Sequence, residues 1–531
     1  MVLNYFKSAF RNIKKNKIYS LINLLSLCIG IACCILIYTY VKYELSYDEF
    51  FDHADQIYRL EFLAQNGDQL ATRYANIPKY DNPGDIRSIP GIQKQTRFAL
   101  MQTIYVQAKN KKIAEPHFIE ADSHFFSLFS LPLIKGNRKT ALKEPGSIVI
   151  SKKIACKYFG THKAMGQTLT LSVQGKKAEV TVTGIMENLP SNSHMQFDAV
   201  SSKSLSETLS GYKLADLYVA YTYLMLGKNQ NPRTIKKQLA QLSSKNHPGP
   251  IDYKLQPLTD IHLQSSARYE IKPNSNIRNI YFLIAIGIIL LIIASINFTS
   301  LSTAQALNRY TEAGVRKVLG AQKRQLIAQF LFEAIFFALI SLILSFATIY
   351  LLLPQFNTLT GISFTMTDFL NLKLVSLFLL VSLGIGILAA LYPAIVMSAF
   401  QPVTTLKGIA PTGQKGSSLW KSIVVIQFAG SIAMIIGTVT IYRQLSYIQN
   451  KNLGFNKDRV VTFQNPDGKH YKPLQSQIKS VPGVQQVAIS SFIPGVSKTG
   501  GTGLVKAEGR TVTLIFHWVS VGYNYFDTYH I

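Results

Sequence analysis

The sequence predicts an α-helical integral membrane protein with five transmembrane helices and a large α/β extracytoplasmic domain. The 531-residue chain has a positive mean hydropathy, and its apolar residues gather in five runs that are nearly free of charge. These runs are Leu21–Val41, Ile280–Phe298, Leu331–Leu353, Leu374–Met397 and Ile423–Ile441. Each has about 19–24 residues, which at about 1.5 Å per residue is enough to cross a hydrocarbon core of about 30 Å. Core helices of a soluble protein would keep a polar stripe, which these runs lack.

The first run is too long to be a cleaved secretory signal. It follows a basic segment, as a signal does, but the apolar part of a signal has only about 7–15 residues. A lipoprotein signal ending at Cys33 is disfavoured for the same reason, because the apolar run continues to Val41. We therefore interpret 21–41 as a retained membrane helix.

The distribution of Lys and Arg predicts which segments face the cytoplasm. Residues 1–19 carry five Lys or Arg and no acid, 301–328 carry five against Glu312 alone, and 398–420 carry two lysines and no acid. The connector 354–372 has Asp368 as its one charged residue. Because short loops rich in Lys and Arg stay inside, we expect a cytoplasmic N-terminus in the inner (plasma) membrane and a periplasmic large domain. Because Lys and Arg are distributed in this way, the net charge of +27 is not interpreted as a sign of a nucleic-acid partner.

These topological signals divide the chain into seven parts. We expect a basic cytoplasmic N-terminus (1–20), a first transmembrane helix (21–41), an extracytoplasmic domain (42–276), a permease domain with helices two to four (277–400), a cytoplasmic linker (401–420), a fifth transmembrane helix (421–443) and the start of a second extracytoplasmic domain (444–531).

The large domain has local patterns of both helix and strand. Ser147–Ile150 is predicted to be a strand, followed by Ser151 as N-cap, a helix over Lys152–Phe159 and Gly160 as C-cap. The β-rich runs Thr168–Val173 and Glu179–Ile185 flank Gly175 and predict a hairpin.

The chain resembles itself at an offset of 400 residues. The first span aligns with the fifth, Gly30 with Gly430, and Leu45-Ser46-Tyr47 with Leu445-Ser446-Tyr447. With a small gap, Ile89-Pro90-Gly91-Ile92 corresponds to Val481-Pro482-Gly483-Val484. Because these matches keep their order, we predict a duplicated protein with units of about 400 residues, of which the second is incomplete here.

Few residues have the spacing of a catalytic or metal site. The sequence has four cysteines and ten histidines but no His-x-x-x-His or Cys-x-x-Cys pair, so zinc is not indicated. A membrane enzyme is also disfavoured, because no paired acid and base or nucleophile set is found. We expect no catalytic, cofactor-binding or metal-binding residues.

Five segments distributed along the chain carry a resemblance to a known family. They are FFSLFSLPLIKGN (125–137), SIVISKKIACKYFG (147–160), VTGIMENLPSNSHMQFD (182–198), LQPLTDIHL (255–263) and NFTSLSTAQALNRYTEAGVRKVLGAQKRQLIAQFLFE (297–333). Together they resemble the FtsX-like/MacB-like ABC transporter permeases, in the duplicated form with MacB-like periplasmic core domains. The family pattern implies a span, a core domain and three more spans, repeated once. Relative to that pattern this chain is C-terminally truncated.

The resemblance further implies that ATP is hydrolysed by a nucleotide-binding domain. A phosphate-binding loop needs Gly-x-x-x-x-Gly-Lys-Ser/Thr, and the nearest approach, Gly495 to Thr502, has Gly501 where the lysine is required. We therefore expect the ABC ATPase, with its bound ATP, to be a separate polypeptide. The other expected partners are the lipid bilayer, a second permease copy, and envelope adaptor or outer-membrane proteins.

The segment between the second and third spans is the candidate site for coupling to that ATPase. The residues assigned to docking are Glu312, Gly314, Val315, Arg316, Lys317, Gly320 and Ala321. Taken without the resemblance, the same pattern also fits an ordinary cytoplasmic helix with a solvated basic face. We expect a helix over Thr303–Leu319 that ends at Gly320.

Two polar residues of the spans complete the candidates. Asn297 is expected to form an interhelical hydrogen bond, because an unpaired amide in lipid is unfavourable. Glu333 lies at a membrane edge, where a carboxylate can reach water. A proton-carrying role for Glu333 is therefore the less favoured interpretation. The predicted function is a permease subunit for export, such as efflux, or for mechanotransmission. A membrane-anchored sensor or scaffold that binds envelope partners without ATP is the alternative, and only the permease needs a coupling segment.

Overall fold

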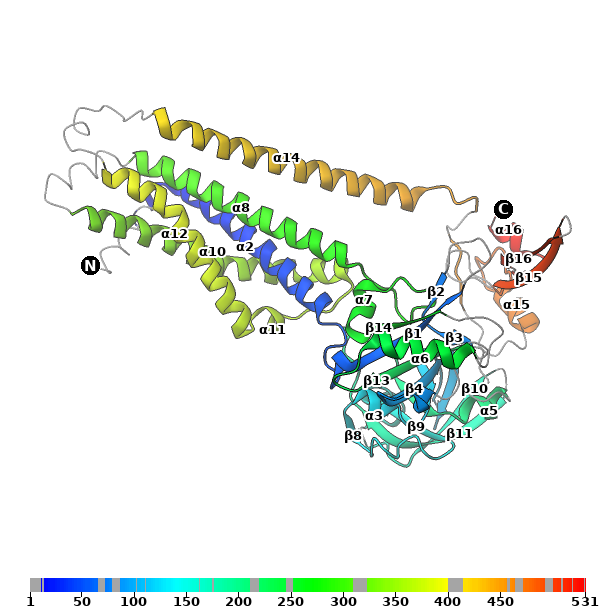
Figure 1. The fold of residues 1–531 in the computed structure, drawn as a ribbon. Coiled ribbons are helices and arrows are strands. Elements are labelled where there is room, and N and C mark those ends of the chain that lie inside the picture. Colours follow the sequence, from blue (N-terminus) through cyan, green and yellow to red (C-terminus); the bar gives the residue numbers. More distant parts are fainter. Residues whose placement is uncertain are drawn as a thin grey trace. The chain divides into compact units, whose positions relative to one another are not determined.

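The structure of the protein is a computed structural model with two compact units. It describes residues 11, 14–64, 72–78, 86–101, 103–109, 111–161, 163–173, 176–210, 219–244, 252–308, 322–399, 414–455, 459–463, 471–491, 500–507, 510–517, 519–529 and 531. The membrane unit comprises Met1–Leu45 and Ile277–Lys451, and the outer unit comprises Ser46–Asn276 and Asn452–Ile531 (Figure 1).

The membrane unit is built from long helices. They are α2 (Lys17–Leu45), α8 (Ile277–Asn308), α10 (Lys323–Thr360), α12 (Leu372–Ala399) and α14 (Gln414–Asn450), with the short α11 (Met366–Phe369) between α10 and α12. All five long helices have the length and apolar composition needed to cross a membrane. The predicted fold class with five spans is therefore confirmed. Helices form here because only a helix pairs every backbone group within its own segment inside lipid.

Four of these helices share one apolar core. The cluster joins residues of α2, α8, α10 and α12, among them Ile31, Phe298 and Phe337. α14 is different, because the most apolar stretch of this helix has no buried residue. Its Ile435 is 63% exposed, whereas Ile35 of α2, the residue 400 positions earlier, is fully buried.

The fifth helix is longer than its apolar part. It covers Gln414–Asn450 and so extends beyond the expected span 421–443 at both ends. The expected linker 401–420 and the expected outer segment from 444 therefore overlap α14. A helix needs no apolar residues to continue past the membrane, and Asn450 Nδ2 donates to Ser446 O at 2.9 Å in its last turn.

The outer unit contains one large mixed sheet. Its strands are β1 (Ile57–Ala64), β2 (Thr72–Tyr74), β3 (Ile77–Pro78), β4 (Ile92–Leu100), β5 (Ile104–Ala108), β6 (Lys111–Glu115), β7 (Phe118–Ala121), β8 (Leu133–Lys135), β9 (Ser147–Ser151), β10 (Thr168–Val173), β11 (Lys176–Met186), β12 (Ala199–Ser202), β13 (Val219–Leu226) and β14 (Asp252–Pro257). The order across the sheet is β14-β1-β13-β4-β7-β12-β9-β11-β10-β5-β6. β7 pairs with β12, and β9 with β11, in parallel, and the other described pairs are antiparallel.

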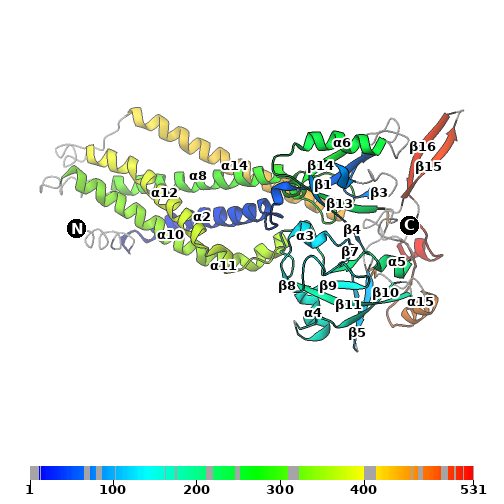
Figure 2. The same ribbon diagram turned by 60° about the horizontal axis from the view of Figure 1, so that its bottom comes forward.

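Helices cover the sheet and complete the α/β architecture (Figure 2). They are α3 (Phe125–Phe129), α4 (Lys152–Phe159), α5 (Leu205–Ser210), α6 (Pro232–Ser244) and α7 (Ile261–Gln264). The local predictions in this region are confirmed. Ser151 Oγ accepts from Ile154 N at 3.2 Å at the start of α4, and Gly160 ends the helix with φ 69°. β10 and β11 form the predicted hairpin, whose turn lies outside the described residues.

The second stretch of the outer unit repeats local structure of the first. It contains α15 (Tyr471–Lys479), β15 (Gly500–Ala507), β16 (Arg510–His517) and α16 (Tyr525–Tyr529). α16 lies 400 residues after α3. Asp122 N donates to Arg97 O at 3.2 Å, and Gly522 N donates to Ile489 O at 2.7 Å in the same way. The duplication stays a prediction, and these two hydrogen bonds are in keeping with it.

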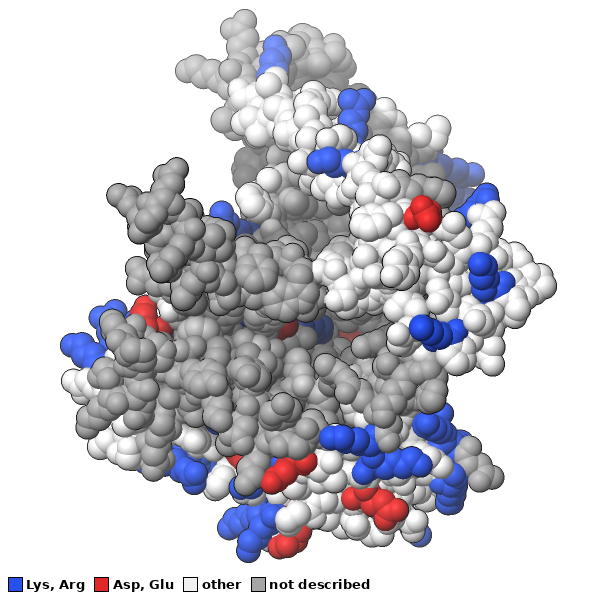
Figure 3. Space-filling model, turned by 90° about the vertical axis from the view of Figure 1, so that its right-hand side faces the viewer, with Lys and Arg blue, Asp and Glu red and all other residues white. Residues whose placement is uncertain are grey.

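Basic side chains mark one end of the large sheet. β6 is the last strand in the order, and both Lys111 and Lys112 are exposed on it. Lys111 Nζ donates to Lys157 O of α4 at 2.7 Å, and Lys112 Nζ lies 4.7 Å from the centroid of the Tyr105 ring. Lys and Arg are also more frequent than Asp and Glu on the face shown in Figure 3, in keeping with the net charge of +27.

Candidate functional site

The coupling residues predicted from sequence lie outside the described residues. Glu312, Gly314, Val315, Arg316, Lys317, Gly320 and Ala321 all fall within 309–321. The structure describes the two helices that this segment joins. α8 ends at Asn308, and α10 begins at Lys323 behind Gln322, whose side chain and that of Gln325 form a reciprocal N-terminal cap. The docking assignment stays a prediction.

The two polar residues of the spans have partners within the membrane unit. Asn297 Nδ2 of α8 donates to Ser26 Oγ of α2 at 2.6 Å, which is a hydrogen bond between helices. Glu333 is buried in α10 and accepts from Gln329 Nε2 one turn earlier at 3.3 Å.

The structure reveals a polar cluster that was not predicted. We call it the root of the outer unit and define it as residues 46–51, 191–194 and 261–276. In sequence, residues 46–51 follow α2 directly and 261–276 precede α8 directly. The root therefore contains two of the three segments through which the chain passes between a membrane helix and the outer unit, and the third follows α14.

Aromatic stacking and a lysine join the segment after α2 to the segment before α8. The rings of Tyr47 and His262 are stacked, with centroids 3.4 Å apart and an angle of 3° between their planes. Lys272 Nζ donates to Tyr47 Oη at 3.0 Å and to Ser191 O at 3.0 Å. One ammonium group thus bridges all three parts of the root.

Asp48 is the centre of the second set of contacts. It has φ +60°, a conformation that Asp and Asn adopt more readily than most residues. Its carboxylate accepts from Ser193 Oγ at 2.8 Å, from His194 N at 3.2 Å and from His194 Nδ1 at 2.7 Å. Because an ionised carboxylate only accepts, we assign a proton to Nδ1 of His194. On the other side of that ring, Nε2 lies 2.7 Å from Tyr223 Oη.

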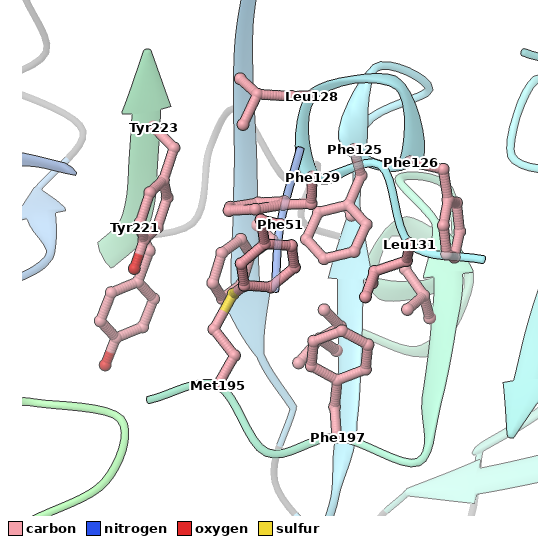
Figure 4. Packing of buried hydrophobic residues seen from close by; sticks show 14 of the residues in the cluster. Phe51, Phe125, Phe126, Leu128, Phe129, Leu131, Met195, Phe197, Tyr221 and Tyr223 are labelled. Atoms are coloured by element: carbon pink, nitrogen blue, oxygen red, sulfur yellow. The ribbon is translucent and has the colours of Figure 1, made fainter. Parts of the chain in front are cut away.

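Tyr223 connects the root to the apolar core of the outer unit. Its ring packs against Phe129 and Phe98, and Phe51 of the root packs against Phe129 in the same cluster (Figure 4). Burial raises the pKa of Tyr223 well above its usual range, although nearby Arg59 opposes the shift. Asp48, His194 and Tyr223 are all at most 2% exposed. The three side chains therefore have no access to a substrate, and their role is to fix the chain to the core.

An ion pair fixes the segment before α8 to the sheet. Arg59 of β1 is fully buried and contacts Glu270 through both Nη atoms, at 2.5 and 2.7 Å, and Glu61 at 2.7 Å. Ser265 Oγ donates to Glu270 at 2.6 Å. Burial alone would lower the pKa of Arg59, but Tyr223 and Glu270 outweigh it and raise that pKa. The guanidinium stays charged and holds two carboxylates together.

The signals for the root were present in the sequence but scattered. His194 lies in the segment VTGIMENLPSNSHMQFD and His262 in LQPLTDIHL, two segments that carry the family resemblance. Tyr47 and Asp48 follow the first span directly. Polar and aromatic residues next to the ends of two spans indicate that a polar cluster forms there. Which of these residues contact one another depends on the fold.

Comparison with known proteins agrees with this architecture. The family described as MacB-like periplasmic core domain matches residues 20–242, and the family described as FtsX-like permease C-terminal matches residues 284–402. The chain belongs to the FtsX-like/MacB-like ABC transporter permeases. This permease is a membrane protein of the ABC transporter type with an extracytoplasmic α/β core domain.

Individual relatives share shorter stretches with this permease. The macrolide export ATP-binding/permease proteins MacB from two strains of Campylobacter jejuni subsp. jejuni are 31% identical over 124 residues, which cover 23% of this chain and 18% of each relative. The matched stretch thus spans less than a fifth of those proteins.

Two solved structures are similar to part of the permease. A domain of a putative permease protein from Porphyromonas gingivalis is 23% identical, with a TM-score of 0.32. The match covers 39% of this chain and 92% of the Porphyromonas chain. The periplasmic region of MacB from Actinobacillus actinomycetemcomitans is 14% identical, with a TM-score of 0.31, and covers 39% of this chain and 91% of that chain.

Proposed function

We propose that this permease couples ATP hydrolysis by a separate ABC ATPase subunit to motion of its outer domain, for export or mechanotransmission. The observation that carries the proposal is the continuity of α8. This helix of 32 residues runs from Ile277, next to the root in sequence, to Asn308, next to the predicted docking segment. At 1.5 Å per residue it is about 48 Å long, which exceeds a hydrocarbon core of about 30 Å.

The proposed orientation places the docking segment in the cytoplasm. The Lys and Arg residues of 1–19, 301–328 and 398–420 support a cytoplasmic N-terminus in the inner membrane and a periplasmic outer domain. In this arrangement the ATPase binds at 309–321 and supplies ATP hydrolysis, so that the permease itself needs no catalytic residue or cofactor. Arg316 and Lys317 would contact the ATPase, and the small Gly314 would allow close approach of its surface.

The proposal is tested in the intact transporter with its ATPase. Gly314→Trp and Arg316→Glu should leave membrane insertion unchanged but separate ATP hydrolysis from motion of the outer domain. Motion is measured as an ATP-dependent change in the distance between spin labels on the outer unit and on α10. Lys421→Glu reverses an exposed charge outside the segment and is the matched control.

Two results would contradict the proposal in different ways. If both variants keep full ATP-dependent motion, 309–321 is an ordinary connector. If no ATPase co-purifies with the protein and ATP has no effect on the wild-type distance, the protein is a membrane-anchored sensor or scaffold.

A further inference from the structure

Arg97 of β4 has buried guanidinium donors that are not paired within the outer unit. Its Nε and Nη2 atoms are buried, and neither has a hydrogen-bond partner in the part of the chain that the structure describes. These two nitrogens lie side by side on one edge of the planar group, from which an arginine donates two parallel hydrogen bonds to the oxygens of one carboxylate or phosphate. Because Arg97 as a whole is only partly buried, a small solute can reach it.

The two acids beside Arg97 are held by other donors. Asp122, directly after β7, accepts from the backbone N of Arg97 at 2.8 Å and from Thr96 Oγ1 at 2.8 Å, and the Thr96 side chain lies on the opposite face of β4 from that of Arg97. Glu120 of β7 accepts from the backbone N and the Oγ of Ser206. Burial lowers the pKa of Arg97, and the attraction of Asp122 opposes this shift only in part.

Two further polar atoms lie on the same face of the sheet as Arg97. Thr222 of β13 is directly opposite Arg97 in the strand register, and side chains paired in this way share a face, with Cβ atoms about 4.5–5.5 Å apart. Gln95 precedes Arg97 by two residues and lies on this face as well. Thr222 Oγ1 and Gln95 Oε1 are both buried and, like the Arg97 donors, have no hydrogen-bond partner among the described residues.

The surroundings of these polar atoms are apolar and rigid. Leu60 of β1 is opposite Thr222, and Leu224 of β13 is opposite Gln95. Both leucines are fully buried in the core cluster that α6 covers. In such a position an unpaired cation is costly, and its contact with an anion is stronger than in water. β4 and β13 are interior strands of the sheet, so they hold the donors in place before a ligand arrives.

We propose that Arg97, Thr222 and Gln95 bind the carboxylate or phosphate group of a small soluble anion. Arg97 Nε and Nη2 donate to two oxygens of that group, and Thr222 donates from Oγ1. Gln95 Oε1 accepts from a hydroxyl of the ligand where one is present. Arg59, in contrast, has two carboxylate partners from the chain itself. The proposed site lies within the outer unit and does not depend on coupling to an ATPase.

Anion binding is measured on the intact permease in detergent. Inorganic phosphate and acetate are each exchanged for chloride at constant pH and ionic strength, and hydrogen exchange of the backbone amides of residues 95–98 and 221–224 is followed. A ligand that binds only the folded state slows this exchange. We expect phosphate or acetate, and not chloride, to increase protection until it saturates. Tighter binding of phosphate identifies a phosphate-bearing ligand, and tighter binding of acetate identifies a carboxylate.

Two variants and a control assign the binding to these residues. Arg97→Lys keeps the charge but loses the two parallel donors, so its affinity should fall at least about tenfold. Thr222→Val keeps the shape of the side chain and loses the hydroxyl, so its affinity should fall about two- to tenfold. Arg233→Lys changes an exposed arginine of α6 and should leave the affinity unchanged.

The result that overturns the proposal is protection that does not depend on the anion. Equal protection in chloride, phosphate and acetate would mean that water satisfies the buried donors. Saturable protection that is the same in wild type, Arg97→Lys and Thr222→Val would place the anion elsewhere. Because Thr222→Val removes one oxygen contact and no charge, it decides the question even if Arg97→Lys does not fold.

Discussion

Asp48 and His194, 146 residues apart in the sequence, are joined by a 2.7 Å hydrogen bond between Asp48 Oδ2 and His194 Nδ1 with both side chains buried. This contact fixes the turn after the first membrane helix to a loop of the outer domain. The other contacts of the root also join distant parts of the chain, and each can be weakened by one substitution.

Asp48→Ala should loosen the root strongly. It leaves the donors of Ser193 and His194 buried without an acceptor, and each buried polar group left unpaired costs about 1–3 kcal/mol. Asp48→Asn is the matched variant, because Asn accepts the same positive φ and keeps one acceptor oxygen, so we expect a loss of about 1–2 kcal/mol. Hydrogen exchange of residues 192–197 measures both. Equal exchange in the two variants would show that the acceptor oxygen kept by Asn contributes nothing to the root.

Gly30→Ala should separate α2 from α8. The added Cβ would lie 2.5 Å from that of Ala294, and overpacking of this kind costs about 1–3 kcal/mol. The reaction rate of Cys34 with a maleimide in detergent reports the separation, because this thiol is buried beside α8. Ala294→Gly in the same chain should restore the wild-type rate. Gly384→Ala on α12, where a Cβ meets nothing within 4 Å, is the control and should change nothing.

Arg59→Met should destabilise the outer unit in a pH-dependent way. Without the guanidinium, Glu61 and Glu270 lose their cation in a buried site, and removal of one partner costs about 3–5 kcal/mol. Burial then favours the neutral carboxyls, so the variant binds protons more tightly when folded than when unfolded. Its deficit should shrink at pH 5 and grow at pH 7.5, measured by thermal unfolding in detergent. A deficit independent of pH would mean that lost packing, not charge, is responsible.

Glu120 should make the contact between β7 and α5 weaken as pH rises. Burial raises the pKa of this carboxyl, and the hydrogen bonds from Ser206 oppose the shift only in part. A raised pKa in the folded state contributes stability at low pH, which is lost as pH rises from the ordinary carboxyl value of about 4.3 toward the raised value. The protection factors of residues 205–210, in which the intrinsic pH dependence of amide exchange is divided out, should therefore fall through this window. Glu120→Gln should remove the pH dependence, and its persistence there would exclude Glu120 as the cause.

Local signals were sufficient to predict the parts of the fold that are local. Five apolar runs of the right length gave five helices, and Ser151 and Gly160 marked the two ends of α4 because both act on neighbouring backbone groups. The full length of α14 was not predictable from hydropathy, since a helix continues through polar residues such as Arg443 without an apolar signal.

The root could not be derived from sequence because its contacts are distant along the chain. Arg59 and Glu270 are 211 residues apart, and Asp48 and His194 are 146 residues apart. The sequence indicated that Asn297 needs a hydrogen-bond partner. It did not indicate that this partner is Ser26. The docking segment at 309–321 was proposed from the family resemblance and stays a prediction.

The lysines of β6 have a consequence for the protein outside its own fold. An outermost strand offers unpaired backbone groups to any extended chain that approaches, which is how sheets grow from one molecule to the next and form aggregates. A chain that paired with β6 would lie beside the ammonium groups of Lys111 and Lys112 and would displace the water that hydrates them. The sheet is therefore poorly suited to polymerise from this side, even at the high protein concentrations of a crowded cell envelope.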